Sequence, residues 1–564
     1  MRLSKGFFKL TFILLLICSS SFASDTLLFV SPVEHDVKLS GNFMELRTNH
    51  FHTGIDIKSS NGRVGDPVKT VAEGYISRIK VQSGSYGQVL YIDHPNGYTS
   101  VYAHLDSFNP EVEQWVEDLQ YGLESFEIDV YLPDSLFRLN AGQFIGTMGN
   151  TGRSFGPHLH FELRETKTEI PVNPELYNFG PQDKIAPVYE NLVIYSINEL
   201  DQITGSEIRY FKNKKPVYRL HSDLVSYGSS KIAFGVMSYD QINGSYNKNG
   251  INAYKLFMDD SLMVDWKAEN YSFSESRKIN GFLDYERQLR YGQKVYRLFS
   301  PKCNALNSFE NSLEGIIDLG DNERHEIRIE VSDIFDNRSI IEFDITKEVS
   351  EEADDTQEQS CLQEQIFQSG MFRIEFEAES FFDDPGEMSI LKTTEKIMGQ
   401  TCHKLTIDKL STPVAKYYKV SCPVPEKDIE SWCYISKDKR GRWVNFGADT
   451  LENRLVSKID QLGELYLFKD TIAPKIEVLR LDKDLKRPWL FRISDNLIPD
   501  GKTEDLYYEA SVNGQWVCLE YDAKSDQLLF DDFHRLPRED FDFILKVGDA
   551  QSNLSSFEVR ISDK

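Results

Sequence analysis

The stretch Gly156-Pro157-His158-Leu159-His160-Phe161-Glu162-Leu163 is the most informative part of this chain of 564 residues. Its polar and apolar residues alternate, which is the pattern of a β-strand with one face in a core. On such a strand His158, His160 and Glu162 project to one side, and the apolar residues between them project to the other. A His-x-His pair on its own does not identify a site, so the surrounding sequence decides its meaning.

Length and composition predict several soluble domains behind a cleaved leader. A chain of this length corresponds to about four domains of ~150 residues, and 40% hydrophobic with 27% charged residues is ordinary for packed domains. Residues 1–23 differ, because basic residues precede an apolar run over 10–17 and small and polar residues lead up to Ala23. We interpret residues 1–23 as a secretory signal peptide that is too short to span a bilayer.

The chain is therefore expected to be exported, either to the periplasm or into the medium. Lipidation at Cys18 is less favoured, because the preceding residue, Ile17, is not small. No apolar stretch after Ala23 is long enough for a transmembrane segment. Removing the three basic residues of the leader leaves 60 Lys and Arg against 89 Asp and Glu, a net charge of −29. This charge argues against nucleic acid as a partner and against adsorption to an anionic surface.

Histidines gather in the first 160 residues, which hold seven of the 11. One of them begins the stretch His52-Thr53-Gly54-Ile55-Asp56-Ile57, which again alternates. Fully extended, His52 and Asp56 would be about 13 Å apart, too far to hold one metal. We therefore expect Gly54 to form a bend or bulge that brings the two side chains together.

A third histidine lies at the end of a predicted hairpin. Strands over 88–93 and 98–103 flank Asn96-Gly97, a strong turn pattern. His104 follows the second strand directly. A single histidine there is usually a surface or core residue, but three such clusters on strands, one with a carboxylate, indicate a site.

Taken together, these motifs resemble the M23 (LytM/lysostaphin-type) peptidases. The resemblance covers roughly residues 41–176 and implies a small antiparallel β fold around one zinc, usually cleaving peptide bonds in bacterial peptidoglycan. The matching segments are Phe43-Met44-Glu45-Leu46-Arg47, His52-x-x-x-Asp56, Gly65-Asp66-Pro67-Val68, Ala72-Glu73-Gly74, Tyr102-Ala103-His104-Leu105, and Gly146-Thr147-Met148-Gly149-Asn150-Thr151-Gly152 leading into Gly156-Pro157-His158-Leu159-His160.

By motif position, the resemblance makes His52, Asp56 and His160 the zinc ligands, and it makes His104 and His158 catalytic histidines. Two neutral imidazoles and a carboxylate suit a tetrahedral zinc whose fourth position is left for water. Zinc lowers the pKa of such a water towards 7. No His-Glu-x-x-His motif occurs, so proton transfer falls to histidine. Which of the two catalytic histidines accepts the proton, and which donates to the oxyanion, stays open.

The predicted peptidase domain, residues 41–182, contains an acidic insert over 106–141. Asn109-Pro110 is typical of a helix start, and apolar residues at helical spacing follow until Gly122 can end the helix. The insert is either a surface decoration or, because it follows His104, a lid or substrate wall.

Beyond this domain, and after an N-terminal segment over 24–40, we expect about three β-sandwiches, so the fold class is all-β dominated. Asp183-Lys-Ile-Ala-Pro recurs as Asp470-Thr-Ile-Ala-Pro, and Asp333 with Asn337 recurs as Asp549 with Asn553. We interpret the shared Asp and Asn as turn-forming in preference to metal-binding. The predicted units are immunoglobulin-like sandwiches over 183–346 and 470–564, an acidic linker over 347–360, and a sandwich over 361–469.

We consider two main functions. The first is an exported zinc endopeptidase that cuts cross-bridge or stem peptides of peptidoglycan, and the second is a non-catalytic LytM-like protein that binds peptidoglycan and regulates another hydrolase. A third, less favoured function is that of a zinc peptidase that cleaves exported proteins. The complete histidine and ligand set favours the enzyme. The β-sandwiches would space the enzyme or dock it to a cell-envelope protein. Among the six cysteines after the leader, Cys402, Cys422 and Cys433 are the closest candidates for a disulfide.

Overall fold

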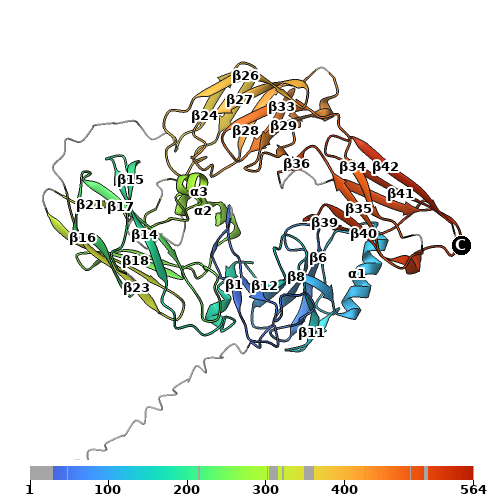
Figure 1. Cartoon of the computed structure of the whole chain (residues 1–564), viewed down its shortest axis with the longest axis horizontal. Helices are drawn as coiled ribbons and strands as arrows, with labels where there is room; N and C mark the ends of the chain where they lie inside the picture. Colours follow the sequence, from blue (N-terminus) through green and yellow to red (C-terminus); the bar gives the residue numbers. More distant parts are fainter. Residues whose placement is uncertain are drawn as a thin grey trace, which may run out of the picture.

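The computed structural model is all-β dominated with a small helical part, which confirms the predicted fold class. Figure 1 shows four groups of strands arranged in a ring. We call them the N-terminal unit (29–182), the second unit (183–347), the third unit (361–469) and the fourth unit (470–562). The predicted domain boundaries and the immunoglobulin-like character of the sandwiches stay predictions.

The structure describes residues 29–47, 49–213, 216–300, 303, 315–320, 323–347, 361–425, 427–482, 484–500 and 506–562. The predicted signal peptide and residues 348–360 of the predicted linker lie outside these ranges. Within them, no helix is both long enough and apolar enough to cross a membrane.

An 11-stranded sheet forms the N-terminal unit. Its main path, in spatial order, runs through β1 (Leu39–Gly41), β4 (Ile55–Lys58), β12 (His158–Glu165), β8 (Tyr98–Phe108), β7 (Gln88–Asp93), β6 (Gly74–Val81) and β10 (Arg138–Leu139). The strands attached at its sides are β5 (Pro67–Lys69), β9 (Ile128–Tyr131), β11 (Phe144–Met148) and β13 (Pro171–Val172). The remaining elements are the hairpin of β2 (Leu46–Arg47) and β3 (His50–Phe51) and the 3-10 helix η1 (Pro174–Tyr177).

Two local predictions are confirmed here. The hairpin at Asn96-Gly97 joins β7 to β8. The insert contains α1 (Pro110–Leu123), and the side chain of Asn109 accepts hydrogen bonds from the first backbone N–H groups of this helix. The helix runs slightly further than expected, because it ends after Gly122 with Glu124 in the left-handed conformation, at φ 51°.

In its described residues, the second unit consists of two facing sheets and three short helices. One sheet contains β15 (Ile203–Arg209), β14 (Val188–Ile197), β17 (Lys231–Tyr239), β20 (Tyr296–Arg297) and β21 (Ile317–Asp318). The other contains β16 (Val217–Tyr227), β23 (Arg338–Lys347), β22 (Arg324–Ser332), β18 (Ala253–Met258) and β19 (Ser261–Lys267). The helices are η2 (Phe273–Lys278), α2 (Ile279–Phe282) and α3 (Tyr285–Tyr291).

The hydrophobic core of the second unit takes in side chains from the N-terminal unit. Phe43, Met44, Leu46 and Phe51 are all buried in it. These residues belong to the β2–β3 hairpin and the segment before it, which lead directly into His52. The second unit therefore supports this part of the N-terminal unit from behind.

The third and fourth units each contain two sheets. The third has β24 (Gln365–Ser369), β25 (Phe372–Phe376), β28 (Tyr418–Pro423), β32 (Arg454–Ile459) and β31 (Asp449–Leu451) facing β26 (Ile390–Ile397), β27 (Gln400–Ile407), β33 (Glu464–Lys469), β29 (Trp432–Lys437) and β30 (Trp443–Asn445), with η4 (Ile429–Ser431). The fourth has β34 (Lys475–Arg480), β35 (Trp489–Ser494), β40 (Gln527–Phe530) and β39 (Glu520–Asp522) facing β38 (Gln515–Trp516), β37 (Tyr507–Val512), β41 (Phe541–Gly548) and β42 (Leu554–Ile561), with η5 (Phe533–Arg535). Between these units, β36 (Ile498–Pro499) pairs with β30.

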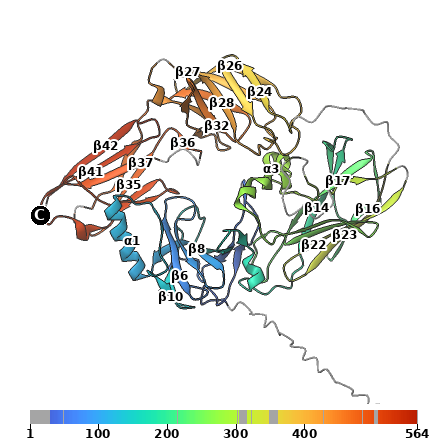
Figure 2. The same ribbon diagram turned by 180° about the vertical axis from the view of Figure 1, so that it is seen from behind.

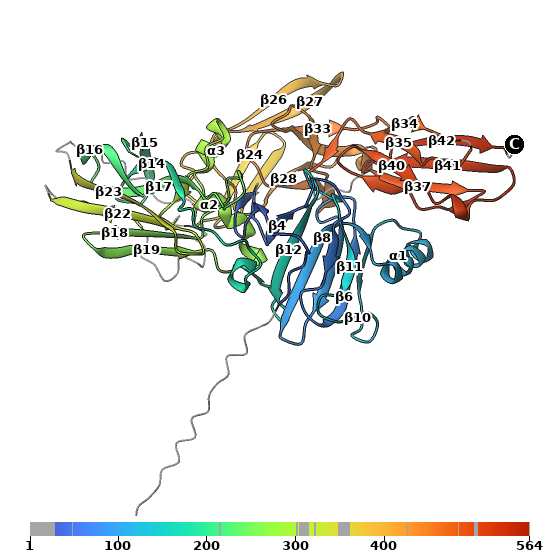
Figure 3. The same ribbon diagram turned by 60° about the horizontal axis from the view of Figure 1, so that its bottom comes forward.

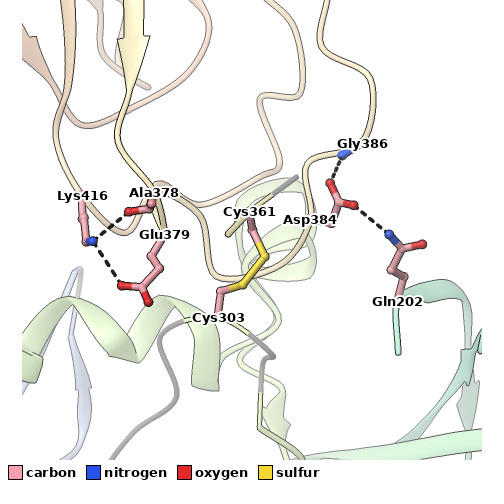
Figure 4. The surroundings of a disulfide bond; sticks show 8 residues. All are labelled: Gln202, Cys303, Cys361, Ala378, Glu379, Asp384, Gly386 and Lys416. Carbon is pink, nitrogen blue, oxygen red and sulfur yellow. Dashed lines mark hydrogen bonds and ion pairs between the residues drawn. A yellow bond between two sulfur atoms is a disulfide. The ribbon is translucent and has the colours of Figure 1, made fainter. Parts of the chain in front are cut away.

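A disulfide joins Cys303 to Cys361, between the second and third units (Figure 4). The expected pairing among Cys402, Cys422 and Cys433 is wrong, because these three cysteines are buried and free. Spacing along the chain misled the prediction. The bonded pair is 58 residues apart in sequence but meets where the two units touch.

The ring closes where the fourth unit meets the insert of the N-terminal unit, as the opposite view in Figure 2 also shows. The Arg535 guanidinium lies 3.9 Å from the centre of the Tyr121 ring and pairs with Glu117 at 2.7 Å. The Tyr121 hydroxyl donates to Asp532, and its ring contacts Trp516. Figure 3 shows α1 at the side of the N-terminal sheet that faces the fourth unit. The insert therefore serves as a docking platform.

Replacing Tyr121 and Arg535 together by alanine is expected to open the ring. The cation–π contact and the ion pair contribute about 2 kcal/mol together, so their loss raises the open-to-closed ratio roughly 30-fold. Small-angle X-ray scattering should then give a larger radius of gyration. Arg560→Ala, an exposed change on β42 away from the contact, is the control. A scattering profile of the double variant that matches the wild type contradicts the docking.

Candidate functional site

The candidate site lies on the central strand β12, which runs between β4 and β8. In this register His160 stands opposite Asp56 on one side and opposite Ala103, the neighbour of His104, on the other. His52 lies in the turn between β3 and β4. The expected bend is present at Gly54, where a Cβ atom would lie 2.2 Å from the carbonyl oxygen of Phe161. Only glycine allows the chain to pass so close to β12.

The three predicted ligand residues converge on one point. His52 Nε2 lies 2.9 Å from Asp56 Oδ1 and 3.0 Å from His160 Nδ1, and the last two atoms are 3.0 Å apart. All three residues are buried, and together they form a group that could hold a metal ion.

The hydrogen-bond partners behind the histidines fix which ring nitrogen carries a proton. His52 Nδ1 lies 2.8 Å from the backbone oxygen of Asn42, which can only accept, so Nδ1 donates and Nε2 is left with a lone pair. His160 Nε2 lies 2.8 Å from the carboxylate of Glu162, so Nδ1 of His160 is left with a lone pair as well. With Asp56 Oδ1, three lone pairs face one another. This donor set fits a cation, and zinc is bound by such ligands.

Glu162 lies at the centre of a buried network that the ligand prediction did not include. It accepts hydrogen bonds from Tyr86, Thr53 and Arg164 as well as from His160. Burial alone would raise the pKa of Glu162, but Arg164 and His160 hold this pKa far below its ordinary value. The carboxylate therefore stays charged and keeps His160 in the tautomer described above. Its place on the polar face of the alternating strand was visible in the sequence, whereas no sequence pattern marked Tyr86.

Asp56 is held from its other oxygen by Arg47. The guanidinium lies 2.8 Å from Oδ2 of Asp56 and 3.6 Å from Glu45. Arg47 thus leaves Oδ1 of Asp56 to face the histidines and orients the carboxylate.

The two predicted catalytic histidines lie beside this group. The rings of His104 and His158 are 4.8 Å apart, and His158 Nε2 lies 3.5 Å from Asp56 Oδ1. Their Nδ1 atoms are each 2.8 Å from a backbone oxygen, of Thr151 and Gly156 respectively, so Nδ1 donates in both rings and both Nε2 atoms carry lone pairs.

His104 is held in an unusual environment. Its backbone has φ 60°, a left-handed conformation that costs a non-glycine residue on the order of 1 kcal/mol. Burial, together with His160 and His158, lowers its pKa to about 3. The ring is therefore neutral at pH 7. The predicted place of His104 directly after a strand over 98–103 is wrong, because β8 continues to Phe108 and His104 lies within it, where the pairing with β7 shifts register. Backbone strain beside a polar cluster is typical of functional sites.

A cavity of about 300 Å³ lies between the fourth unit and the loop over 150–152. The Thr151 backbone oxygen in this loop accepts a hydrogen bond from the His104 ring. The lining of the cavity includes Thr151 and Gly152 on one side, and Glu520, Asp522 and Lys524 on the other. The ammonium group of Lys524 donates to the backbone oxygen of Asn150, directly before Thr151. The fourth unit therefore borders the site as well as the insert.

Comparison with known proteins finds similarities to the N-terminal unit. Residues 50–121 and 137–174 match Peptidase family M23. DD-carboxypeptidase/endopeptidase Mpg of Neisseria meningitidis is 35% identical over 129 residues, and peptidoglycan DD-endopeptidase ShyA of Vibrio cholerae is 29% identical over 183 residues. The solved structure of a zinc containing peptidase from Vibrio cholerae shares 25% identity with a TM-score of 0.18, covering 25% of this chain and 37% of that one.

These similarities are confined to a part of each protein. The alignment with Mpg covers 23% of both chains, and the alignment with ShyA covers 31% of this chain and 36% of the relative. The predicted resemblance to M23 peptidases is confirmed for this segment.

Gly54→Ala is expected to destabilise the N-terminal unit, because the added methyl group would overlap the Phe161 carbonyl. Overpacking of this kind costs about 1–3 kcal/mol, which lowers the melting temperature by roughly 5 °C. Gly156→Ala is the matched control, since a Cβ atom there meets nothing within 4 Å. Calorimetry that finds equal melting temperatures for both variants contradicts the close approach of the two strands.

Proposed function

Because residues 50–121 and 137–174 match Peptidase family M23, we propose that this protein is an exported zinc endopeptidase that hydrolyses peptide bonds in bacterial peptidoglycan. The observation that carries the proposal is the convergence of three lone pairs, from His52, Asp56 and His160, beside two further histidines. The relatives in this family that bear enzyme names act on peptidoglycan or as carboxypeptidases and endopeptidases, which supports the substrate class.

We propose that zinc binds where the lone pairs of His52, Asp56 and His160 converge. Two imidazole nitrogens and one carboxylate oxygen form a borderline donor set that zinc accepts readily. Each ligand has a partner behind it: the Asn42 carbonyl for His52, Glu162 for His160, and Arg47 for Asp56. Such partners orient the ligands before the metal arrives. When bound, zinc supplies a Lewis acid that polarises a carbonyl and makes water acidic.

His104 and His158 would move the protons of the reaction. Both present Nε2 towards the site, and their Nδ1 atoms are occupied by the Thr151 and Gly156 backbone oxygens. One Nε2 lone pair can accept a proton from the attacking water, and the other ring can donate to the oxygen on which negative charge develops only in its imidazolium form, with a proton on Nε2 as well as on Nδ1. The backbone bonds prevent either ring from turning away.

The fourth unit would limit access to the site. It contacts the loop of Asn150 and Thr151 and docks on α1, so it would border a substrate bound at the histidines. This is the substrate-wall role considered for the insert over 106–141, with the fourth unit forming the wall and the insert holding it. We propose that the β-sandwiches also bind a cell-envelope protein.

The proposed export is supported by the disulfide between Cys303 and Cys361, because disulfides persist in oxidising compartments. The acidic composition is consistent with this location. The leader over residues 1–23, which would direct export, lies outside the described residues.

Alanine at His104 or at His158 is expected to lower turnover about 10²–10⁴-fold while zinc stays near one ion per chain. Alanine at His52 should remove most of the zinc. Elemental analysis of the purified variants measures the metal, with the exposed change His221→Ala as the control. If His104→Ala loses its zinc, this residue belongs to the ligand set and the division of roles is wrong.

Purified chain from residue 24 onwards, incubated with peptidoglycan sacculi, should release peptide fragments, and a zinc chelator should stop the release. Mass spectrometry of the fragments identifies the bond. Binding to sacculi without any fragment would instead favour the non-catalytic regulator, and zinc-dependent cleavage of an unfolded exported protein alone would favour the third function.

A further inference from the structure

Two clusters of aspartates lie outside the candidate active site, one in the second unit and one in the fourth. Asp183, Asp240 and Asp333 form the first, and Asp470, Asp495 and Asp549 form the second. In each cluster one carboxylate oxygen from each residue lies within 4.8 Å of the others.

The clusters occupy equivalent positions in the two units. Asp183 and Asp470 begin the repeated Asp-x-Ile-Ala-Pro motif. Asp240 and Asp495 directly follow the central strands β17 and β35, and Asp333 and Asp549 directly follow β22 and β41. The chain has therefore built the same arrangement twice.

The repeated turns explain only part of this arrangement. The backbone N–H and side-chain amide of Asn337 donate to the carboxylate of Asp333, and Asn553 does the same for Asp549. These bonds show that the repeated Asp and Asn form a turn, as predicted, whereas the predicted preference for this role over metal-binding is not tested by them. They do not involve the carboxylates of Asp240 and Asp495.

Within these two clusters, four carboxylate oxygens are buried without a hydrogen-bond donor among the described residues. They are Asp183 Oδ2 and Asp240 Oδ1 in the first cluster, and Asp470 Oδ2 and Asp495 Oδ1 in the second. Asp183 and Asp240 are only 6% and 4% exposed. A buried carboxylate without a partner is costly, so such oxygens require a proton or a cation.

The first cluster surrounds a cavity of about 10 Å³, which has room for on the order of one water molecule or ion. Glu175 lines the same cavity, and no Lys, Arg or His does. Burial, together with Asp333 and Asp183, raises the pKa of Asp240 to about 8. Carboxylates crowded in this way hold their charge only if a positive ion joins them.

We propose that each cluster binds one hard divalent cation, and that calcium is the best fit. The ligands are all oxygens, which excludes a preference for zinc. Magnesium keeps several of its waters, for which a cavity of this size has no space, whereas calcium accepts many carboxylate and carbonyl oxygens in flexible geometry.

Both clusters lie at junctions between units. Asn42 of the N-terminal unit lines the cavity of the first cluster. Its side chain is hydrogen-bonded to Gly250 of the second unit, and its backbone oxygen accepts a hydrogen bond from His52. Near the second, Gln551 in the turn after Asp549 accepts a hydrogen bond from Asn445 of the third unit. Bound cations would therefore stiffen the ring, and the first would do so directly behind a proposed zinc ligand.

The test uses the chain from residue 24 onwards, stripped of divalent ions and reloaded with one equivalent of zinc. Native mass spectrometry and calorimetry with calcium chloride should count two calcium ions per chain, and magnesium chloride should give weaker binding. A hundredfold excess of calcium over its Kd should raise the melting temperature on the order of 5 °C. The calcium count does not depend on catalysis, so it stands or falls separately from the proposed peptidase activity.

Asp240→Asn and Asp495→Asn should each bind one calcium ion, and the double variant none. Without calcium, both single variants should melt no lower than the wild type, because removing a charge relieves repulsion; this separates a lost site from a misfolded protein. Asp336→Asn is the matched control, since Asp336 lies in the same turn as Asp333 but points to solvent and pairs with Arg338. Absence of calcium binding in the wild type, or binding that both variants retain in full, overturns the proposal.

Discussion

The antiparallel pairing of β12 with β4 and β8 is the constraint on which the candidate site depends. It sets His160 directly opposite Asp56 on one side, and next to His104 on the other. A shift of one residue in either register would turn His160 into the core and bring an apolar side chain to the site. The buried apolar residues of β12 prevent this shift, so the packing of the sheet also fixes the chemistry of its polar face.

The charged and polar side chains on that face form a chain of contacts that ends at the proposed metal site. Glu162 is the most deeply buried, Arg164 neutralises it, and it in turn orients His160 towards the proposed metal. Each member is buried and partnered, which a polar network needs in order to stabilise a fold. His104 and His158 are held at Nδ1, by backbone oxygens and in His158 also by the Ser154 hydroxyl, so their Nε2 atoms face the site.

Local sequence patterns predicted the elements but not their long-range contacts. Alternation predicted β12, Asn96-Gly97 predicted the hairpin of β7 and β8, and Asn109-Pro110 predicted the start of α1, because each depends on neighbours a few residues away. The disulfide of Cys303 and the docking of the fourth unit depend on contacts across units, and the third aspartate of each cluster depends on contacts between segments of one unit that are far apart in sequence. Asp240 had no motif around it, so only the fold could show that it joins Asp183.

The N-terminal unit depends on the second unit for part of its packing, although the match to Peptidase family M23 covers all five proposed ligand and catalytic residues. Phe43, Met44, Leu46 and Phe51 bury their side chains in the core of the second unit, immediately before His52. Burial of four such side chains stabilises this junction by about 6–12 kcal/mol as an upper estimate. The hairpin that positions His52 is therefore held by the core of the second unit, whereas Asp56 and His160 are held by strands of the N-terminal sheet. Because the metal needs all three, the junction between the units is itself part of the site.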